Sequence, residues 1–108
     1  MRIELAYLAG LFDGEGCAGV YRYTSRNNRA YPLMTVQMCD PGPVDEFHRV
    51  FGGYRAIQPR KNARRPVHVW LVSHRKALTA AQSLLPYCHN DAKRAQMNEI
   101  IRHYTRKH

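Results

Sequence analysis

The chain has 108 residues and a formal net charge of +9 at pH 7, from 17 Lys and Arg residues against 8 Asp and Glu residues. A domain of this size buries a modest core, and a domain this basic is typical of proteins that bind a polyanion. No apolar run approaches the ~20 residues of a membrane helix, and three scattered cysteines without a CxxC pair argue against a disulfide framework and a zinc site. We therefore expect one domain, residues 1–108, with nucleic acid as its first candidate partner, although a solvated basic surface without a partner is the alternative.

A helix is predicted over residues 2–12 from its apolar periodicity. Its apolar face carries Leu5, Leu8 and Phe12. A second face carries the short side chains of Ala6, Ala9, Gly10 and Asp13. Short side chains let another helix approach closely, either within the chain or from a second copy. Gly14 and Gly16 are expected to end this helix.

The rest of the chain alternates between strand and helix patterns in the order β-β-α-β-β-α-α. These predicted elements are strands 17–24 and 31–39, a helix over 43–51, strands 54–58 and 67–73, and helices over 75–85 and 92–105. A polar loop over 25–30 and a basic loop over 59–66 join the strands of each pair. The whole order predicts a single α+β domain.

Two carboxylates, Asp13 and Glu15, stand directly after the stripe of short side chains. If two copies packed this helix along a two-fold axis, each copy would bring one carboxylate to the same point. Carboxylates held together repel each other unless a cation lies between them, and Mg²⁺ prefers oxygen ligands. The pattern therefore favours a metal-holding dimer.

Residues 8–16, LAGLFDGEG, resemble the nine-residue signature of the LAGLIDADG homing endonucleases. Six positions agree outright: Leu8, Ala9, Gly10, Leu11, Asp13 and Gly16. Phe12 keeps an apolar side chain, Glu15 keeps an acid and Gly14 keeps a small residue. With the predicted order of elements, the resemblance extends from about Ile3 to about Tyr104.

The resemblance implies an αββαββα(α) fold whose curved antiparallel β-saddle lies in the major groove of double-stranded DNA. A single copy of the motif implies a homodimer. The implied activity is that of a homing endonuclease, which makes double-strand cuts in a long, roughly palindromic site and serves intron homing. The implied cofactor is Mg²⁺ or another divalent cation such as Mn²⁺, with no small-molecule cofactor and no membrane partner. The implied location is intracellular: a bacterial or phage-infected cytoplasm, or an organelle.

Carried over residue by residue, the resemblance makes Glu15 the metal-binding acid, helped by the Gly14 carbonyl. Asp13 matches the first acid of the motif, for which a purely structural role at the helix end is favoured. Asp40 matches a polar residue that orients water, but it equally suits a turn-starting Asp before Pro-Gly. Lys93 matches a lysine that stabilises phosphate charge, with a solvated helix start as the alternative.

Strand alternation and charge predict which residues contact DNA. The predicted base-reading and groove residues are Tyr21, Tyr23, Arg26, Asn28, Arg29, Tyr31, Leu33, Thr35, Gln37, His68 and Trp70. The predicted phosphate contacts are Arg60, Lys61, Arg64 and Arg65. Trp70 suits packing within the sheet equally well. Phe47 and Phe51 belong either to the core or to the dimer interface, and we assign them to the interface. The other predicted interface residues are Ala6, Ala9, Gly10 and Asp13.

Two other functions fit parts of the pattern. One is a LAGLIDADG-type protein that binds nucleic acid without cutting it, such as an RNA maturase or a regulator. The other is a basic structural RNA-binding protein of ribosomal type. The joint presence of Glu15, Asp40 and Lys93 favours cleavage over both.

Overall fold

The computed structural model describes residues 2–22, 29–59 and 64–107, and the α+β fold class is confirmed. In chain order the elements are α1 (Arg2–Glu15), β1 (Gly16–Arg22), β2 (Ala30–Met38), α2 (Pro41–Phe51), β3 (Tyr54–Gln58), β4 (Val67–Ser73), α3 (His74–Leu84), the 3-10 helix η1 (Leu85–Tyr87) and α4 (Asp91–Lys107). Five predicted DNA-contacting residues lie outside the described ranges: Tyr23, Arg26, Asn28, Arg60 and Lys61. None of the described helices is long and apolar enough to span a membrane.

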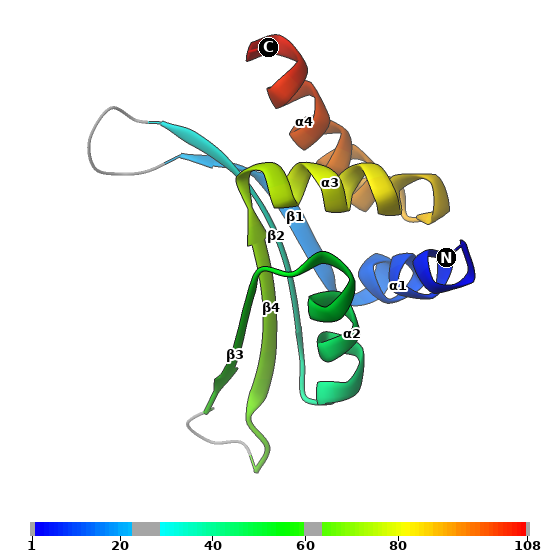
Figure 1. Ribbon diagram of the computed structural model, residues 1–108, viewed down its shortest axis with the longest axis vertical. Helices are drawn as coiled ribbons and strands as arrows, with labels where there is room; N and C mark the ends of the chain where they lie inside the picture. Colours follow the sequence, from blue (N-terminus) through cyan, green and yellow to red (C-terminus); the bar gives the residue numbers. More distant parts are fainter. Residues whose placement is uncertain (1, 23–28, 60–63, 108) are drawn as a thin grey trace.

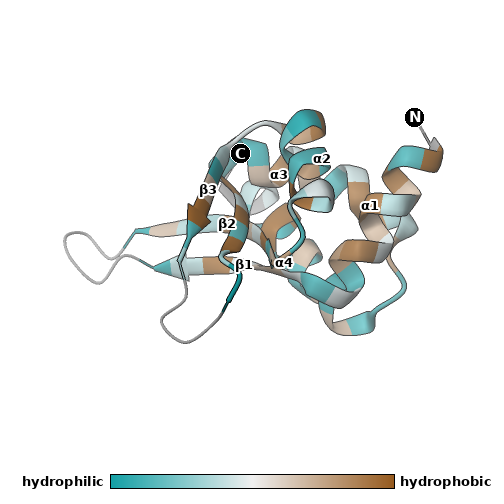
Figure 2. Cartoon of the chain, turned by 90° about the horizontal axis from the view of Figure 1, so that it is seen from below, coloured by the Kyte–Doolittle hydropathy of each residue, from teal (hydrophilic) through white to brown (hydrophobic). Residues whose placement is uncertain are grey.

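The four strands form one antiparallel sheet in the order β1-β2-β4-β3, and the helices cover one of its faces (Figures 1 and 2). Side chains alternate along each strand, and directly paired residues of antiparallel strands share a face. One row of residues therefore crosses the uncovered side of the sheet from β1 to β3. It runs through the pairings Cys17–Thr35, Thr35–Leu71 and Leu71–Tyr54. We call that side the outer face; its residues are Cys17, Gly19, Tyr21, Tyr31, Leu33, Thr35, Gln37, Tyr54, Ala56, Gln58, Val67, Val69, Leu71 and Ser73.

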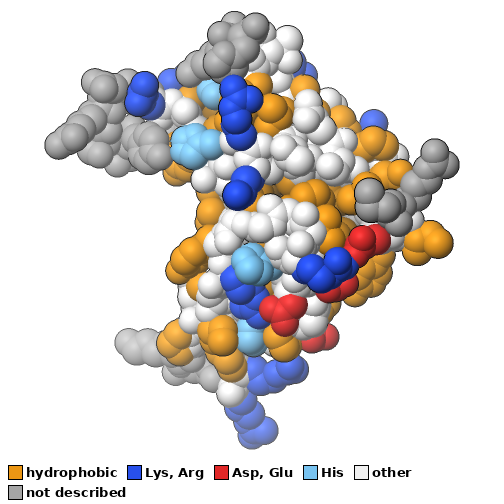
Figure 3. Space-filling model, viewed as in Figure 1, with side chains coloured by type: hydrophobic (Ala, Val, Ile, Leu, Met, Phe, Trp, Pro, Cys, Tyr) orange, Lys and Arg blue, Asp and Glu red, His pale blue; other side chains and the backbone are white. Residues whose placement is uncertain are grey.

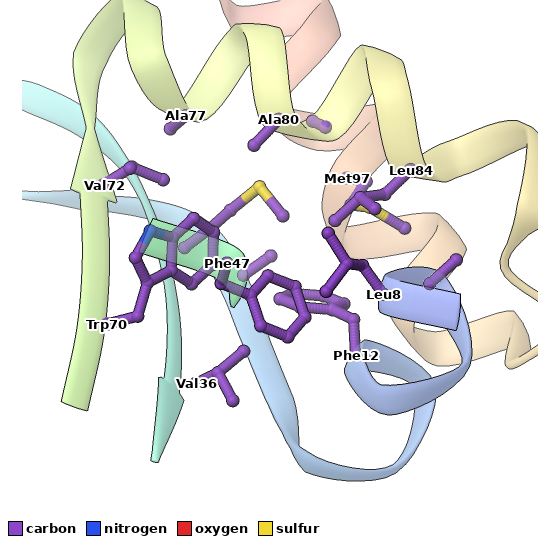
Figure 4. Close-up of a cluster of buried hydrophobic side chains, with 14 of the residues drawn as sticks. Leu8, Phe12, Val36, Phe47, Trp70, Val72, Ala77, Ala80, Leu84 and Met97 are labelled. Atoms are coloured by element: carbon purple, nitrogen blue, oxygen red, sulfur yellow. The ribbon is translucent and has the colours of Figure 1, made fainter. Parts of the chain in front are cut away.

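The core lies between the sheet and the helices, and it corrects two predictions. Trp70 is fully buried and stacks on Phe47, with ring centroids 4.8 Å apart. Figure 4 shows both rings among apolar side chains of α1, α3 and the sheet. Trp70 pairs with Val36 on the helix-covered face, so it is not a groove residue, and the buried Phe47 is not a dimer contact. The Trp70 Nε1 donates to the Gly52 carbonyl at 2.9 Å, which satisfies the indole N–H inside the core.

The same register corrects the prediction for His68. It pairs with Met38 on the helix-covered face, and its Nδ1 lies 2.8 Å from the Arg55 guanidinium. The strand β4 instead turns Val69 and Leu71 to the outer face. Alternation along β4 was predicted correctly, but the side of the strand that the helices leave uncovered was assigned in reverse.

Helix α1 runs three residues farther than predicted, through Gly14 to Glu15. The strand β1 starts at once with Gly16, where an added Cβ would lie 2.2 Å from the Phe12 ring. Glycine is therefore required for the strand to cross directly over this buried aromatic side chain. The abrupt transition leaves Glu15 at the junction of helix and strand.

The side of α1 that faces away from the core differs from the predicted stripe. Ala9 is fully buried in the core, so it is not available to a second copy. The exposed α1 face consists of Ile3, Ala6, Tyr7, Gly10 and Gly14. Ile3 is 87% exposed and Tyr7 is 53% exposed, which leaves two large apolar side chains in water beside a row of short ones.

Gly53 offers a direct test of how the second half of the sheet is joined to α2. Its φ is +95°, and an added Cβ would lie 2.5 Å from Val72 Cγ1 and 2.6 Å from the Leu71 carbonyl oxygen. We expect Gly53→Ala to lower the free energy of unfolding by about 2–4 kcal/mol in urea denaturation, because it combines left-handed strain with overpacking. Gly42→Ala is the matched control, because its Cβ would meet no atom closer than 3.5 Å. Equal stability of the two variants would contradict this account of the junction.

Candidate active site

The start of α4 is attached to the end of α1 through the Asp13 carboxylate. Asp13 Oδ2 accepts from the His89 amide at 2.8 Å, and its Oδ1 accepts from the Asn90 amide at 3.1 Å. Asn90 in turn caps α4, because its side-chain oxygen accepts from the Lys93 amide at 3.0 Å. The structural role favoured for Asp13 fits this geometry, although the helix it serves is α4 rather than its own.

Two further contacts join the first turns of α4 to the start of β1. The Lys93 ammonium donates to the Gly16 carbonyl, and the Ala18 amide donates to Gln96 Oε1 at 3.2 Å. Lys93 and Gln96 are three residues apart and so share one side of the helix. We call the three attachments, at Asp13, Lys93 and Gln96, the α1–α4 clamp. Gln96 was not among the site residues predicted from the sequence, although its three-residue spacing from Lys93 could have indicated it.

Ionisation of Asp13 is tied to this clamp. Partial burial raises the pKa of Asp13, but the hydrogen bonds from the His89 and Asn90 amides, with one from Cys88, outweigh it, so the pKa lies below the usual 3.8. Burial and then the neighbouring Asp13 charge raise the pKa of the Cys88 thiol to about 12. The pair is therefore a carboxylate beside a neutral thiol at neutral pH.

The pKa of Asp13 is lower in the folded chain than in the unfolded chain, so the ionised carboxylate stabilises the fold. This contribution is fully present above pH ~4, and it is lost as the pH falls through the pKa of Asp13 in the folded chain. We expect Asp13→Asn to lower the free energy of unfolding by about 1 kcal/mol at pH 7. The difference from wild type should shrink in denaturation series taken from pH 5 down to pH 2. Glu99→Gln, which removes an exposed carboxylate elsewhere on α4, is the control. A constant difference across this range would show that the Asp13 charge is unimportant.

Glu15 is exposed at the end of α1, next to the carbonyl that holds Lys93. The Glu15 carboxylate and the Gly14 carbonyl are oxygen donors, which is the chemistry that Mg²⁺ prefers. Within residues 2–22, 29–59 and 64–107, no group of three His, Cys, Asp or Glu side chains could hold a metal. The described residues therefore offer fitting oxygen donors at this point, but an incomplete set of ligands.

Asp40, the third residue proposed for catalysis, caps a helix. It follows β2 and caps α2, with Oδ1 accepting from the Gly42 amide at 3.1 Å, so its turn-starting role is present. The guanidinium of Arg94, the residue after Lys93, donates to the Leu85 and Cys88 carbonyls at 2.7 and 3.0 Å. Lys93 instead binds the Gly16 carbonyl, one residue from Glu15, and a water-orienting role for Asp40 stays a prediction.

The outer face carries most of the predicted groove residues that the structure describes. Tyr21, Tyr31, Leu33, Thr35 and Gln37 all lie on it. Figure 3 shows that the outline of the molecule is hollowed on this side. Of the predicted basic contacts, Arg29, Arg64 and Arg65 are exposed near the ends of the strands.

Several outer-face residues were not identified from the sequence. Among them are Tyr54, Gln58, Leu71 and Ser73, on β3 and β4. Tyr54 is 57% exposed and Gln58 is also exposed. Only the register of β3 and β4 reveals them, because neither strand shows by its composition which side is covered.

Phe51 is half-buried beside Trp70, with ring centroids 5.9 Å apart. Like Phe47 it therefore contributes to the core of its own chain. Asp13 is used in the clamp, and Ala9 in the core. Of the predicted dimer contacts, Ala6 and Gly10 remain on an exposed surface.

No family model matches the sequence, and the search of curated proteins gives no match either. Solved structures do match the fold. The homing endonuclease I-CvuI, solved with its DNA target and Ca²⁺, has a TM-score of 0.74 and 19% identity over 94% of this chain and 65% of its own length. The intron-encoded homing endonuclease I-CeuI, solved with DNA, has a TM-score of 0.68 and 15% identity over 99% of this chain and 57% of its own length.

The LAGLIDADG homing endonuclease I-GzeII, also solved with its DNA target, has a TM-score of 0.64 and 17% identity over 95% of this chain and 36% of its own length. The chain thus spans about two thirds of the I-CvuI length and smaller shares of the others. At these identities the matches establish the architecture of the chain.

Proposed function

We propose that this chain, which has the LAGLIDADG homing endonuclease fold, is a metal-dependent endonuclease that makes double-strand cuts in a long, roughly palindromic DNA site. The observation that carries the proposal is that the Lys93 ammonium binds the Gly16 carbonyl, one residue from the exposed Glu15, where α1 meets the sheet. An acid that can hold a cation and a fixed positive charge both favour hydrolysis of a phosphodiester, because they stabilise the negative charge of the reacting phosphate. The basic composition and the hollowed outer face supply a surface for the duplex.

The roles of the residues follow from their places. Glu15 and the Gly14 carbonyl would hold Mg²⁺ or Mn²⁺, which when bound polarises the scissile phosphate and lowers the pKa of the attacking water. Lys93, fixed by its bond to the Gly16 carbonyl, would direct positive charge at the phosphate as negative charge develops. The clamp through Asp13 and Gln96 fixes the start of α4, and with it Lys93, against the helix–strand junction that carries Glu15.

Glu15→Gln tests this assignment, because it keeps the shape of the side chain and removes its charge. We expect Mg²⁺-dependent cutting of a selected DNA target to fall by about 100-fold or more, since even groups that only orient metal ligands contribute 10- to 100-fold. DNA binding in a mobility-shift assay should be retained. Glu99→Gln should cut like the wild type. If Glu15→Gln cut DNA at the wild-type rate, the assignment of Glu15 as a metal ligand would be wrong. If the wild-type protein bound DNA but did not cut it, the result would favour a LAGLIDADG-type protein that only binds nucleic acid.

We also propose that two copies associate through the exposed α1 face. Ile3 and Tyr7 leave apolar surface exposed to water. The small residues on the same face, Ala6, Gly10 and Gly14, permit close approach of a second helix. A two-fold pairing of this kind would bring a second Glu15 to the incomplete set of ligands. It would also give the site its palindromic character, with one half-site for each outer face.

Gly10→Leu tests the pairing without threatening the fold. A Cβ at Gly10 meets no atom within 4 Å in the single chain, and leucine is a better helix former than glycine by close to 1 kcal/mol. We expect the variant to fold and to sediment as a monomer at a concentration where wild type is a dimer. Thr79→Leu, on the exposed side of α3, should remain dimeric. A dimer that survives Gly10→Leu unchanged would place the interface elsewhere.

A further inference from the structure

The outer face has no charged residue along any of its four strands, all of which the structure describes. Exposed arginines stand beyond its ends instead. Arg29 lies directly before β2, at the end where β1 meets β2, and Arg64 and Arg65 lie between β3 and β4, beyond the ends of both strands. This separation assigns the attraction for phosphates to the two ends and leaves neutral side chains in the middle.

The middle of the outer face is mainly apolar. Thr35 pairs with Leu71, and Leu33 is the next outward residue along β2, so the two leucines are diagonal neighbours. Both are half-buried, and Val69 lies beside them with only 3% of its surface exposed. The Thr35 hydroxyl donates to the Trp70 carbonyl at 2.9 Å, so its proton is already used within the sheet.

The residues that can exchange hydrogen bonds with bases stand around this apolar centre. Gln37 and Gln58 lie toward one end, while Tyr31 and Ser73 lie toward the other. Amide and hydroxyl groups can recognise the polar edges of several bases, but leucine side chains cannot. In the major groove, the C5-methyl group of thymine is the apolar feature that a leucine can contact.

We infer that Leu33 and Leu71 read the centre of each half-site through thymine methyl groups, selecting T at the base pairs they cover. The inference rests on the proposed function and specifies its substrate. A polar base edge pressed against these leucines would lose its water without gaining a partner, which disfavours G and C at the same positions. The basic ends and the net charge of +9 identify the occupant of this face as a nucleic-acid duplex.

The test begins with a target that wild type selects from a randomised duplex library. Thymidine is then replaced by deoxyuridine, one position at a time, which removes the methyl group and leaves the base pairing intact. We expect binding to weaken about fourfold at one or two central positions of each half-site, which corresponds to about 0.8 kcal/mol for a buried methyl group. Replacing cytidine by 5-methylcytidine at a disfavoured position should recover part of the lost binding.

Leu33→Ala and Leu71→Ala should each abolish the preference for thymidine over deoxyuridine at one position. Ile57→Ala is the matched control, because Ile57 is 61% exposed on the opposite face of the sheet and its variant should keep the wild-type preference. A selected and cut target that is insensitive to every deoxyuridine replacement would overturn this inference alone. Failure to select any DNA sequence would overturn the proposed function and the inference together. The deoxyuridine series uses the wild-type protein, so its result remains valid even if one of the leucine variants does not fold.

Discussion

The candidate site depends on the α1–α4 clamp, in which side chains from two ends of the chain fix each other. Asp13 receives the amides before α4, Lys93 binds the Gly16 carbonyl and Gln96 receives the Ala18 amide. Each bond joins residues more than 70 positions apart in the sequence, so the site forms only when the whole domain has folded. The clamp thereby keeps the Lys93 ammonium at the helix–strand junction that also carries the Glu15 carboxylate, and regular secondary structure supports both residues.

Several features were predictable because they depend on local patterns. The apolar period of α1, the alternation along β2 and the Pro and Gly residues around α2 are each encoded over a few residues, so the elements and the α+β class followed from the sequence. The LAGLFDGEG segment identified the fold, and the structural matches bear it out. The structural role that the resemblance implies for Asp13 fits its hydrogen bonds from the His89 and Asn90 amides, although these residues precede α4.

The features that could not be predicted are those set by contacts between distant segments. Alternation along β4 shows two faces, but only its register with β2 shows that Trp70 is covered and Leu71 is not. The same limit applies to Phe47, whose place in the core depends on stacking against Trp70. Ala9 and Gly10 illustrate a finer limit: they are adjacent and both small, yet one faces the core and the other faces solvent. A shift of one position around the helix was enough to misplace part of the predicted interface.

The central claim is that two copies of α1 bring their Glu15 carboxylates together around divalent cations at a DNA duplex. A crystal structure of the chain on its selected target with Ca²⁺ in place of Mg²⁺ measures this directly. Two cations about 4 Å apart, each about 2.4 Å from its carboxylate ligand, predict Glu15 carboxylates within about 9 Å of each other. Carboxylates more than about 15 Å apart, or directed away from the duplex, could not share such a site and would contradict the claim.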